Sequence, residues 1–258
     1  MAGPGVSIIT PTFNRHALLR AQYDIVCAQT CQDFEWLILD DGPRPSTWFQ
    51  QLSDPRIRYT YLEDTPMLVS AKRNWLCERA HAPVIAQFDD DDYYAPGYLD
   101  TMLARLEASG ADITKLSAWF VYSAQLKRLG YWDTANTLGL HFAFGPEPVL
   151  NAVFNREAPD NMKNNYAGYG FSYVFRKSMW ETAPFPHVKY ASDFGFVSAA
   201  RDKGCRLDHF ADTEGLCLHV LRKDNMSKSY PQYLLPDFML GKLFSADLSA
   251  LIESSSKA

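Results

Sequence analysis

Four consecutive aspartates, Asp89 to Asp92, directly follow the apolar run Val84 to Phe88. Carboxylates so close together repel one another, and burying them at the end of a strand costs stability unless a cation or hydrogen-bond donors offset the charge. Carboxylate oxygens suit Mg²⁺ or Mn²⁺, which keep open positions for the oxygens of a diphosphate. The competing interpretation is a solvated acidic turn that caps the next helix, because aspartate is favoured at helix N-termini. We interpret the cluster as a divalent metal site.

Two other polar segments follow apolar runs earlier in the chain. Val6 to Thr10 leads into Pro11-Thr12-Phe13-Asn14-Arg15, and Trp36 to Leu39 leads into Asp40-Asp41-Gly42. In an open α/β sheet, ligands bind in the crevice beyond the carboxyl ends of the strands. We therefore expect these segments and the aspartate cluster to meet at one ligand site.

The apolar runs lack the alternation of half-buried strands, which is typical of parallel strands buried on both faces. Between and after them, apolar residues recur at helical spacing. These positions are Leu18, Leu19, Tyr23 and Val26, then Leu68, Ala71 and Trp75, and then Leu99, Met102, Leu103 and Leu106 behind Pro96. The alternation predicts an α/β fold with an open, mostly parallel, right-handed sheet, in which Ile57 to Leu62 is a further strand.

The second half of the chain is less regular. We expect extended segments from Ile113 to Tyr122 and from Tyr173 to Arg176, and a helix from about Asp193 to Asp202. Asp133 to Ala167 contains three prolines and several asparagines, which predicts loops that form a lid or an insertion.

Composition narrows the class of protein. With 258 residues, 47% of them hydrophobic, the chain can bury a substantial core. Its net charge of −5 and the absence of a long basic run argue against nucleic acid as a partner. The five cysteines form no C-x-x-C pair, which favours buried thiols in a reducing compartment.

No basic N-terminal region precedes an apolar stretch, and no apolar run reaches the length of a membrane span, so we expect a cytoplasmic protein. Tyr233 to Phe244 is rich in residue types found at membrane interfaces. It predicts either a peripheral contact of the C-terminal tail with the inner face of the membrane or a helix packed on the body.

Four segments resemble glycosyltransferase family 2, a group of inverting enzymes with the GT-A fold. They are Val6 to Arg15, Trp36 to Gly42, Ala71 to Asn74 and Ala86 to Tyr93. Their order and spacing are similar to the family's through about residue 105, and beyond residue 110 the resemblance is limited to short segments.

The resemblance implies a nucleotide site at the strand ends. It assigns contacts with the nucleotide to Thr10, Pro11, Phe13, Arg15, Asp41, Arg73, Asp89 and Asp90. In the family's Asp-x-Asp signature, the last carboxylate binds the metal directly, which implies Asp91 as the ligand of Mn²⁺ or Mg²⁺. The extra acid at Asp92 leaves the register open by one residue. Asp41 would accept from the ring N–H of uracil or thymine, or would be a turn residue before Gly42; Arg73 would face the nucleotide or solvent.

The resemblance also implies residues of the second half. Asp193, at the start of its helix, matches the catalytic base, although Ser192 stands where a glutamate is common; the alternative is a helix cap. His219 matches a late histidine that completes the metal site, or is a buried core histidine. The sugar side of the site is assigned to Gly168, Tyr169, Gly170 and Arg222. Arg222 would neutralise the diphosphate or be a solvated charge, and Tyr166, Tyr169 and Trp180 would stack on sugars or belong to the core.

Together these features predict a metal-dependent inverting glycosyltransferase that moves a hexose or amino sugar from a UDP or dTDP donor to a carbohydrate or lipid-linked acceptor, in cell-surface polysaccharide synthesis. Residues 1–110 would bind the nucleotide sugar, 111–220 would hold the acceptor and the base, and 221–258 would be a flexible basic loop and a helical tail. The alternatives are a nucleotide-sugar nucleotidyltransferase, which normally has a glycine-rich basic loop after its first strand, and a non-catalytic nucleotide- or calcium-binding module.

Overall fold

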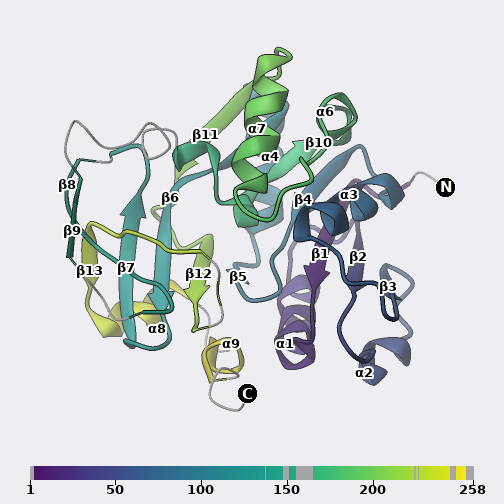
Figure 1. Cartoon of the computed structure of the whole chain (residues 1–258), viewed down its shortest axis with the longest axis horizontal. Coiled ribbons are helices and arrows are strands. Elements are labelled where there is room, and N and C mark those ends of the chain that lie inside the picture. Colours follow the sequence, from purple (N-terminus) through teal and green to yellow (C-terminus); the bar gives the residue numbers. More distant parts are fainter. Residues whose placement is uncertain are drawn as a thin grey trace.

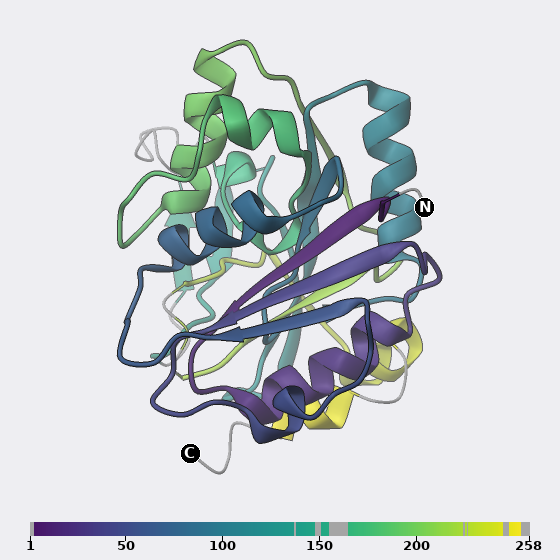
Figure 2. The same cartoon turned by 90° about the vertical axis from the view of Figure 1, so that its right-hand side faces the viewer.

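The strands of the first half form a parallel sheet. In a computed structural model, which describes residues 3–136, 138–147, 151–154, 165–223, 225, 227–244 and 248–253, β1 (Val6–Thr12) lies between β2 (Phe34–Asp40) and β4 (Val84–Gln87). The edge strand β3 (Ile57–Tyr61) is parallel to β2, as the sequence predicted. Figure 2 shows β1, β2 and β3 side by side.

The second half continues the same sheet with mixed directions. β10 (Val174–Arg176) runs antiparallel between β4 and β6 (Ile113–Ser123), and the sheet order is β13-β7-β6-β10-β4-β1-β2-β3. The outer strands of this half are β7 (Arg128–Asp133), β11 (Leu207–Ala211), β12 (Cys217–Leu221) and β13 (Tyr233–Leu235), and the two-residue β5 (Tyr93–Tyr94) pairs with β12. The predicted boundary at residue 110 therefore does not interrupt the sheet.

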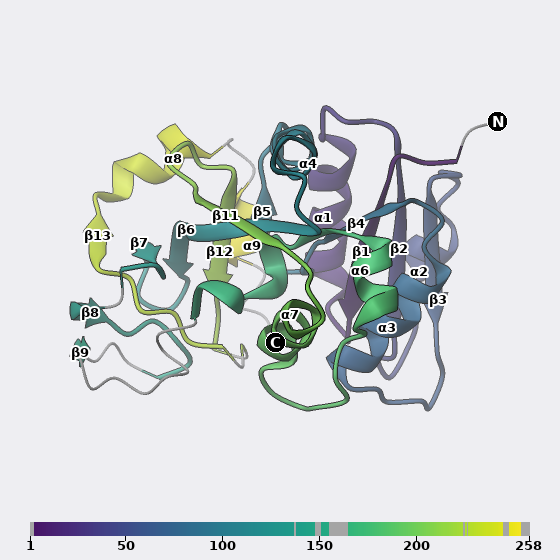
Figure 3. The ribbon, with the colours of Figure 1, turned by 90° about the horizontal axis from the view of Figure 1, so that it is seen from above.

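Helices cover both faces of the sheet. Side chains that alternate along β1 therefore pack in two different cores. Ile8 packs in a core with residues of α1 (His16–Cys27) and α4 (Tyr98–Ser109). Ile9 packs in a second core with residues of α3 (Val69–Arg79), α6 (Lys177–Thr182) and α7 (Ser192–Asp202). Figures 1 and 3 show α1 and α3 on opposite sides of the strands. The predicted α/β architecture is confirmed.

The prediction of loops for Asp133 to Ala167 is wrong in part. β8 (Gly139–Phe142) and β9 (Asn151–Phe154) form a separate two-stranded antiparallel sheet, and η1 (Asn165–Ala167) is a turn of 3₁₀ helix. Backbone partners remote in the sequence support this segment, since the amides of Phe142 and Phe144 donate to the carbonyls of Pro231 and Ser229. The rest of the predicted lid, at 137, 148–150 and 155–164, lies outside the described residues.

The C-terminal tail packs partly on the body, the second of its two predicted arrangements, whereas Tyr233, Leu234 and Phe238 remain exposed. Phe244, Leu248 and Leu251 are buried in a third core with Tyr93 and Phe120. The short elements here are α2 (Thr47–Gln50) in the first half, η2 (Gly170–Ser172) before β10, and η3 (Asp237–Met239), α8 (Leu240–Leu243) and α9 (Ser249–Glu253) in the tail. Over the described ranges, none of the helices has both the length and the apolar character that crossing a membrane requires.

Candidate functional site

The predicted strand ends meet at one edge of the sheet because β1, β2 and β4 are parallel neighbours. β1 reaches two residues further than predicted and ends at Thr12, where it pairs with Asp40 at the end of β2. Thr12 Oγ1 donates to Asp90 Oδ2 over 2.6 Å, which joins the first strand end directly to the acidic turn. The expected convergence of the polar segments is therefore present.

Asp40 and Asp41 have different partners. The carboxylate of Asp40 is fully buried and accepts from Tyr59 Oη at 2.7 Å and from the amide of Gly42 at 2.9 Å. Asp41 forms an ion pair with Lys72 and accepts from the amide of Met67 at 2.7 Å. Lys72 also donates to the carbonyl of Thr12 at 2.8 Å, so it ties the ends of β1 and β2 together.

Gly42 allows the β2 loop to lie against the β1 loop. A Cβ atom at this position would lie 2.8 Å from the amide nitrogen of Asn14, closer than real Cβ atoms come. Asp40 and Gly42 thus form the turn. The carboxylate of Asp41 lies at the edge of the sheet where the nucleobase is predicted to bind.

The acidic turn is balanced by arginines from two remote segments. Arg15 Nη1 lies 3.0 Å from Asp90 Oδ1 and 2.9 Å from Asp91 Oδ2. Arg222 Nη1 lies 3.4 Å from the same Asp91 oxygen, and Asn225 Nδ2 donates to it at 3.2 Å. Arg222 is only 2% exposed, so the solvated alternative for this residue is wrong.

Asp92 lies away from this arginine pair and binds His219 instead. Because β5 pairs antiparallel with β12, Asp92 is brought against β12, where its carboxylate lies 2.9 Å from His219 Nδ1 and accepts from the amide of Val220 at 2.9 Å. The imidazole stacks on Phe171 at a centroid distance of 4.7 Å. These contacts distinguish the two candidate positions for the last carboxylate of the Asp-x-Asp signature: Asp92 orients a histidine, and Asp91 faces the arginines.

His219 has the form of a metal-ligating histidine. Its Nε2 is buried and has no hydrogen-bond partner among the described residues, while Nδ1 is held by a carboxylate. Histidines that bind metals typically donate the other ring N–H to a carboxylate or carbonyl. Within the described ranges, no three His, Cys, Asp or Glu side chains gather as a ready-made metal site. Mg²⁺-type sites commonly take only one or two carboxylates plus substrate phosphates, so a site that uses Asp91 does not require such a cluster.

Burial and mutual repulsion make the acidic turn hard to ionise. Burial, with Asp92, Asp91 and Asp193 nearby, raises the pKa of Asp89 to about 7 against the opposing charge of Arg73. Burial and Asp91 raise the pKa of Asp90 to about 6, although Arg15 and Thr12 act in the opposite direction. For His219, burial opposes the charged form, but the carboxylate of Asp92 prevails and raises the pKa.

These shifts predict how stability depends on pH. A carboxyl whose pKa is higher in the folded than in the unfolded state holds its proton more tightly when folded, so its contribution to stability is lost as pH rises from about 4 through its folded pKa. A divalent cation bound at the turn would offset the repulsion once the carboxyls ionise. We therefore expect Mn²⁺ to raise the melting temperature more at about pH 8 than at about pH 5. Thermal unfolding with Mn²⁺ or EDTA, with NaCl of equal ionic strength as control, measures the change in melting temperature. An equal change at the two pH values would contradict the prediction.

The predicted base, Asp193, lies at the start of α7 and is linked to the acidic turn through one guanidinium. Arg73 Nη1 forms an ion pair with Asp193, and Nη2 lies 3.7 Å from Asp89 Oδ1. Asp193 Oδ2 accepts from the amide of Gly170 at 2.9 Å, and a Cβ at Gly170 would lie 2.7 Å from the Asp193 carboxyl carbon. Asp193 remains 24% exposed, so a ligand can reach it.

Some predicted contacts differ from the arrangement in the structure. Arg73 is buried beside Asp193, whereas its chain neighbour Lys72 binds Asp41. Tyr169 packs edge-on against Trp132, and Trp180 Nε1 donates to Asn74 Oδ1 at 2.8 Å. Both rings therefore serve internal packing. The pairing of Lys72 with Asp41 and that of Asp92 with His219 were not predicted, although Lys72 stands in a segment that carried the family resemblance.

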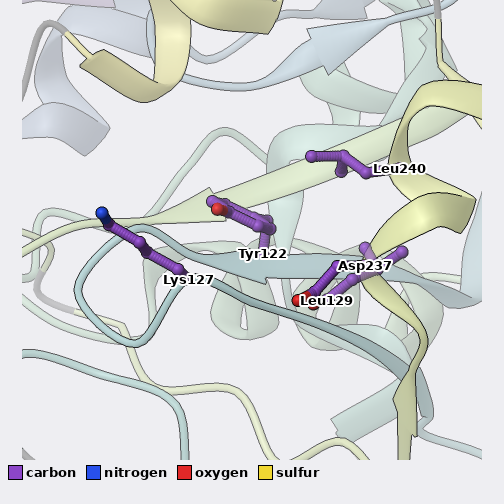
Figure 4. A pocket seen from close by; sticks show the side chains of 5 residues that line it. All are labelled: Tyr122, Lys127, Leu129, Asp237 and Leu240. Atoms are coloured by element: carbon purple, nitrogen blue, oxygen red, sulfur yellow. The ribbon is translucent and has the colours of Figure 1, made fainter.

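A separate pocket lies on the other face of the sheet. It is lined by Tyr122, Lys127, Leu129, Asp237 and Leu240 (Figure 4). Tyr122, Leu129 and Leu240 belong to the core that also contains Val220, whereas the neighbouring His219 points to Phe171. This pocket is thus not part of the acidic site.

Comparison with protein-family models decides the family. The model described as Glycosyl transferase family 2 matches residues 7–168, which is more than half of the 258-residue chain. The chain belongs to glycosyl transferase family 2. The match begins in β1 and includes the ends of β1, β2 and β4, whereas β12 with His219, and Arg222, lie beyond it.

Several named glycosyltransferases are similar to part of this chain. Validoxylamine A glucosyltransferase from Streptomyces hygroscopicus subsp. limoneus is 34% identical over 106 residues, 39% of this chain and 23% of the relative. A putative colanic acid biosynthesis glycosyl transferase, WcaA, from Escherichia coli K12 is 34% identical over 39% of this chain and 37% of the relative. The Campylobacter jejuni GalNAc(5)-diNAcBac-PP-undecaprenol beta-1,3-glucosyltransferase is 27% identical over 43% of this chain and 37% of the relative. The chain thus matches well under half the length of these relatives.

Solved structures extend the likeness of this family 2 chain to its whole fold. Staphylococcus aureus TarS 1-349 in complex with UDP-GlcNAc superposes with a TM-score of 0.61 and 15% identity, over 85% of this chain and 59% of that one. The mannosyltransferase PcManGT from Pyrobaculum calidifontis, in complex with GDP-Man and Mn²⁺, gives a TM-score of 0.57 and 16% identity, over 87% and 59%. The chain has the GT-A fold.

Proposed function

We propose that the chain is a metal-dependent inverting glycosyltransferase, which transfers a hexose or amino sugar from a UDP or dTDP donor. One observation carries the proposal: a single buried arginine, Arg73, contacts both Asp89 of the acidic turn and Asp193. A donor diphosphate at the turn and an acceptor hydroxyl at Asp193 would therefore approach each other across one guanidinium. Such closeness is what direct displacement requires.

The nucleoside end of the donor is proposed to lie over the β1 and β2 loops. Asp41 is the predicted partner of the ring N–H of uracil or thymine. Its oxygens bind Lys72 and the amide of Met67, and its side chain is 1% exposed, so a base can reach it only if the surrounding loops move. The structural neighbour that holds UDP-GlcNAc supports a uridine donor, whereas PcManGT holds GDP-Man. The choice of base is thus open to direct test.

Asp91 and His219 are the residues proposed to hold Mn²⁺ or Mg²⁺. The bound cation would act as a Lewis acid that stabilises the departing nucleoside diphosphate. The chain's own contribution is to orient the ligands: Asp92 holds the His219 ring, and Arg15 and Arg222 neutralise the charge of the turn.

Asp193 is proposed to act as the general base. It would take the proton of the acceptor hydroxyl while that oxygen forms a bond to the anomeric carbon and the bond from this carbon to the diphosphate oxygen breaks. Attack from the side opposite the leaving group inverts the configuration. Arg73, bound to Asp193, orients the carboxylate, and the Gly170 amide fixes its second oxygen.

The acceptor is proposed to be a carbohydrate or a lipid-linked sugar used in cell-surface polysaccharide synthesis. The names of the Escherichia coli and Campylobacter jejuni relatives support this class. A peripheral contact with the inner face of the membrane, by a cytoplasmic protein, would bring such an acceptor to the site. The exposed side chains of Tyr233, Leu234 and Phe238 are compatible with it.

Isothermal titration with UDP, dTDP, GDP and CDP, each with Mn²⁺ and then with EDTA, tests the donor site. We expect one pyrimidine diphosphate to bind in the presence of Mn²⁺ and to lose at least about 10-fold in affinity with EDTA, because the cation bridges protein carboxylates and phosphate oxygens. Binding of none of the nucleotides would refute the transferase proposal. Binding of Ca²⁺ without any nucleotide would favour the non-catalytic module.

A further inference from the structure

Lys115, on β6, is a fully buried lysine with an exposed fraction of 0%. Its Nζ donates to the carbonyl of Tyr166 at 2.6 Å and to that of Gly168 at 2.7 Å. It also lies 5.5 Å from the centre of the Trp119 ring and 5.9 Å from that of Tyr173. In the part of the chain that the structure describes, no carboxylate lies within ion-pair distance of Nζ, so backbone carbonyls and aromatic rings are its immediate partners.

Tyr173 holds the carbonyl between these two. Its hydroxyl donates to the carbonyl of Ala167, so two buried side chains hold three successive carbonyls, those of residues 166, 167 and 168. We call Lys115 and Tyr173 the carbonyl clamp. Nothing in the local sequence of residues 166–168 requires this conformation. The clamp holds it through one residue of β6, Lys115, and one residue directly before β10, Tyr173.

The clamp directly precedes the backbone that binds the proposed base. Tyr169 has a φ of 61°, in the left-handed region that is uncommon for a non-glycine residue. This turn directs the amide of Gly170 at Asp193 Oδ2, over 2.9 Å. The path from Lys115 to Asp193 is thus a short run of main chain with a defined conformation.

A buried lysine without a carboxylate partner is costly. Burial lowers the pKa of Lys115 to about 7, although the negative charge of Asp193 acts in the opposite direction. The cost of burying this charge indicates that Lys115 serves something other than stability.

We infer that Lys115 is a positioning residue, which holds the 166–170 backbone so that the Gly170 amide orients Asp193 for proton transfer. The inference rests on the proposed function for its catalytic consequence, but the clamp itself can be tested without turnover. Tyr173 assists by binding the carbonyl of Ala167.

The test compares Lys115→Met with wild type by hydrogen exchange and by kinetics. Methionine keeps the length of the side chain and removes the charge and the donors. We expect amides of residues 166–172 to exchange about 10-fold faster or more, with the melting temperature unchanged or higher, because the loop loses its clamp while the core loses a buried charge. With UDP-GlcNAc as the probe donor, kcat for UDP release should fall about 10-fold while KM changes little.

Lys177→Met is the matched control, because Lys177 also donates to a backbone carbonyl, that of Ala80 at 2.7 Å, which belongs to a different segment. It should leave exchange in 166–172 and kcat unchanged. A lower melting temperature in Lys115→Met, with unaltered loop exchange and kcat, would reduce Lys115 to a structural residue and overturn the inference. If Lys115→Met does not fold, Tyr173→Phe, which removes one hydroxyl, must accelerate exchange in the same segment or the inference fails.

The two arms separate the inference from the proposed function. Absence of nucleoside diphosphate release in the wild type with every UDP and dTDP sugar would refute the transferase proposal, whereas faster loop exchange in Lys115→Met would still establish the clamp. Wild-type turnover combined with full kcat in Lys115→Met would refute the inference and leave the transferase proposal intact.

Discussion

Replacing Asp193 with asparagine is expected to lower turnover about 100-fold or more while the affinities for donor and metal stay unchanged. Asparagine keeps the size of the side chain and can still accept from Arg73 or from the Gly170 amide, so the helix start and the loop should remain in place. It cannot take a proton from an acceptor hydroxyl. The measurement is single-turnover kinetics at saturating donor, with nucleotide and Mn²⁺ affinities determined by titration.

Asp202 provides the control for this variant. It lies at the other end of the same helix, α7, and is exposed. Asp202→Asn changes the charge of α7 by the same amount without touching the site, so it should retain full turnover. If Asp193→Asn also retains full turnover, Asp193 is a helix cap, and the base must be sought elsewhere.

Asp91→Asn is expected to abolish metal-dependent turnover and to leave the fold intact. The amide keeps the shape of the carboxylate but loses the charge that a hard cation requires. The turn should persist, because Arg15 still pairs with Asp90 and Gln22 Nε2 still donates to the carbonyls of Asp89 and Asp92. Activity measured as a function of Mn²⁺ concentration, with the melting temperature recorded in parallel, tests both parts.

Asp24→Asn is a suitable surface control, since Asp24 pairs with the exposed Arg20 one turn away on α1. Wild-type activity in Asp91→Asn would remove Asp91 from the metal site. If Asp92→Asn were then the variant that lost metal dependence without a change in melting temperature, the register of the signature would shift by one residue. The fully buried Asp92, bound to His219 and the Val220 amide, instead predicts that Asp92→Asn destabilises the fold.

The parallel half of the fold could be predicted because its signals are local. Uninterrupted apolar runs such as Trp36 to Leu39 define strands buried on both faces, and the polar residues that follow them define the edge where ligands bind. The register of β1 against β2, Thr12 opposite Asp40, agrees with this expectation. The family resemblance rested on the same segments, and the family match confirms it.

The β8–β9 sheet could not be predicted in the same way. Its strands are short, and prolines and asparagines surround them, so loop signals dominated. Backbone hydrogen bonds from Phe142 and Phe144 to residues near 230 support the segment, and such partners leave no periodic pattern in either stretch. Contacts between segments so remote depend on how the strands are ordered in the sheet.

By itself, the sequence determined the α/β class, the strand ends that carry polar residues, and an acidic turn too highly charged to be stable without compensation. Only the tertiary structure decided which charged side chains pair with each other. Arg73 pairs with Asp193, 120 residues away, and Asp92 pairs with His219, 127 residues away. These pairs depend on β10 and β12 joining a sheet begun by the first half, which turns long sequence separations into direct contacts. Lys115 could not be predicted for the same reason. A lysine inside a strand is expected at the surface, and only the folded structure shows the remote carbonyls that it binds.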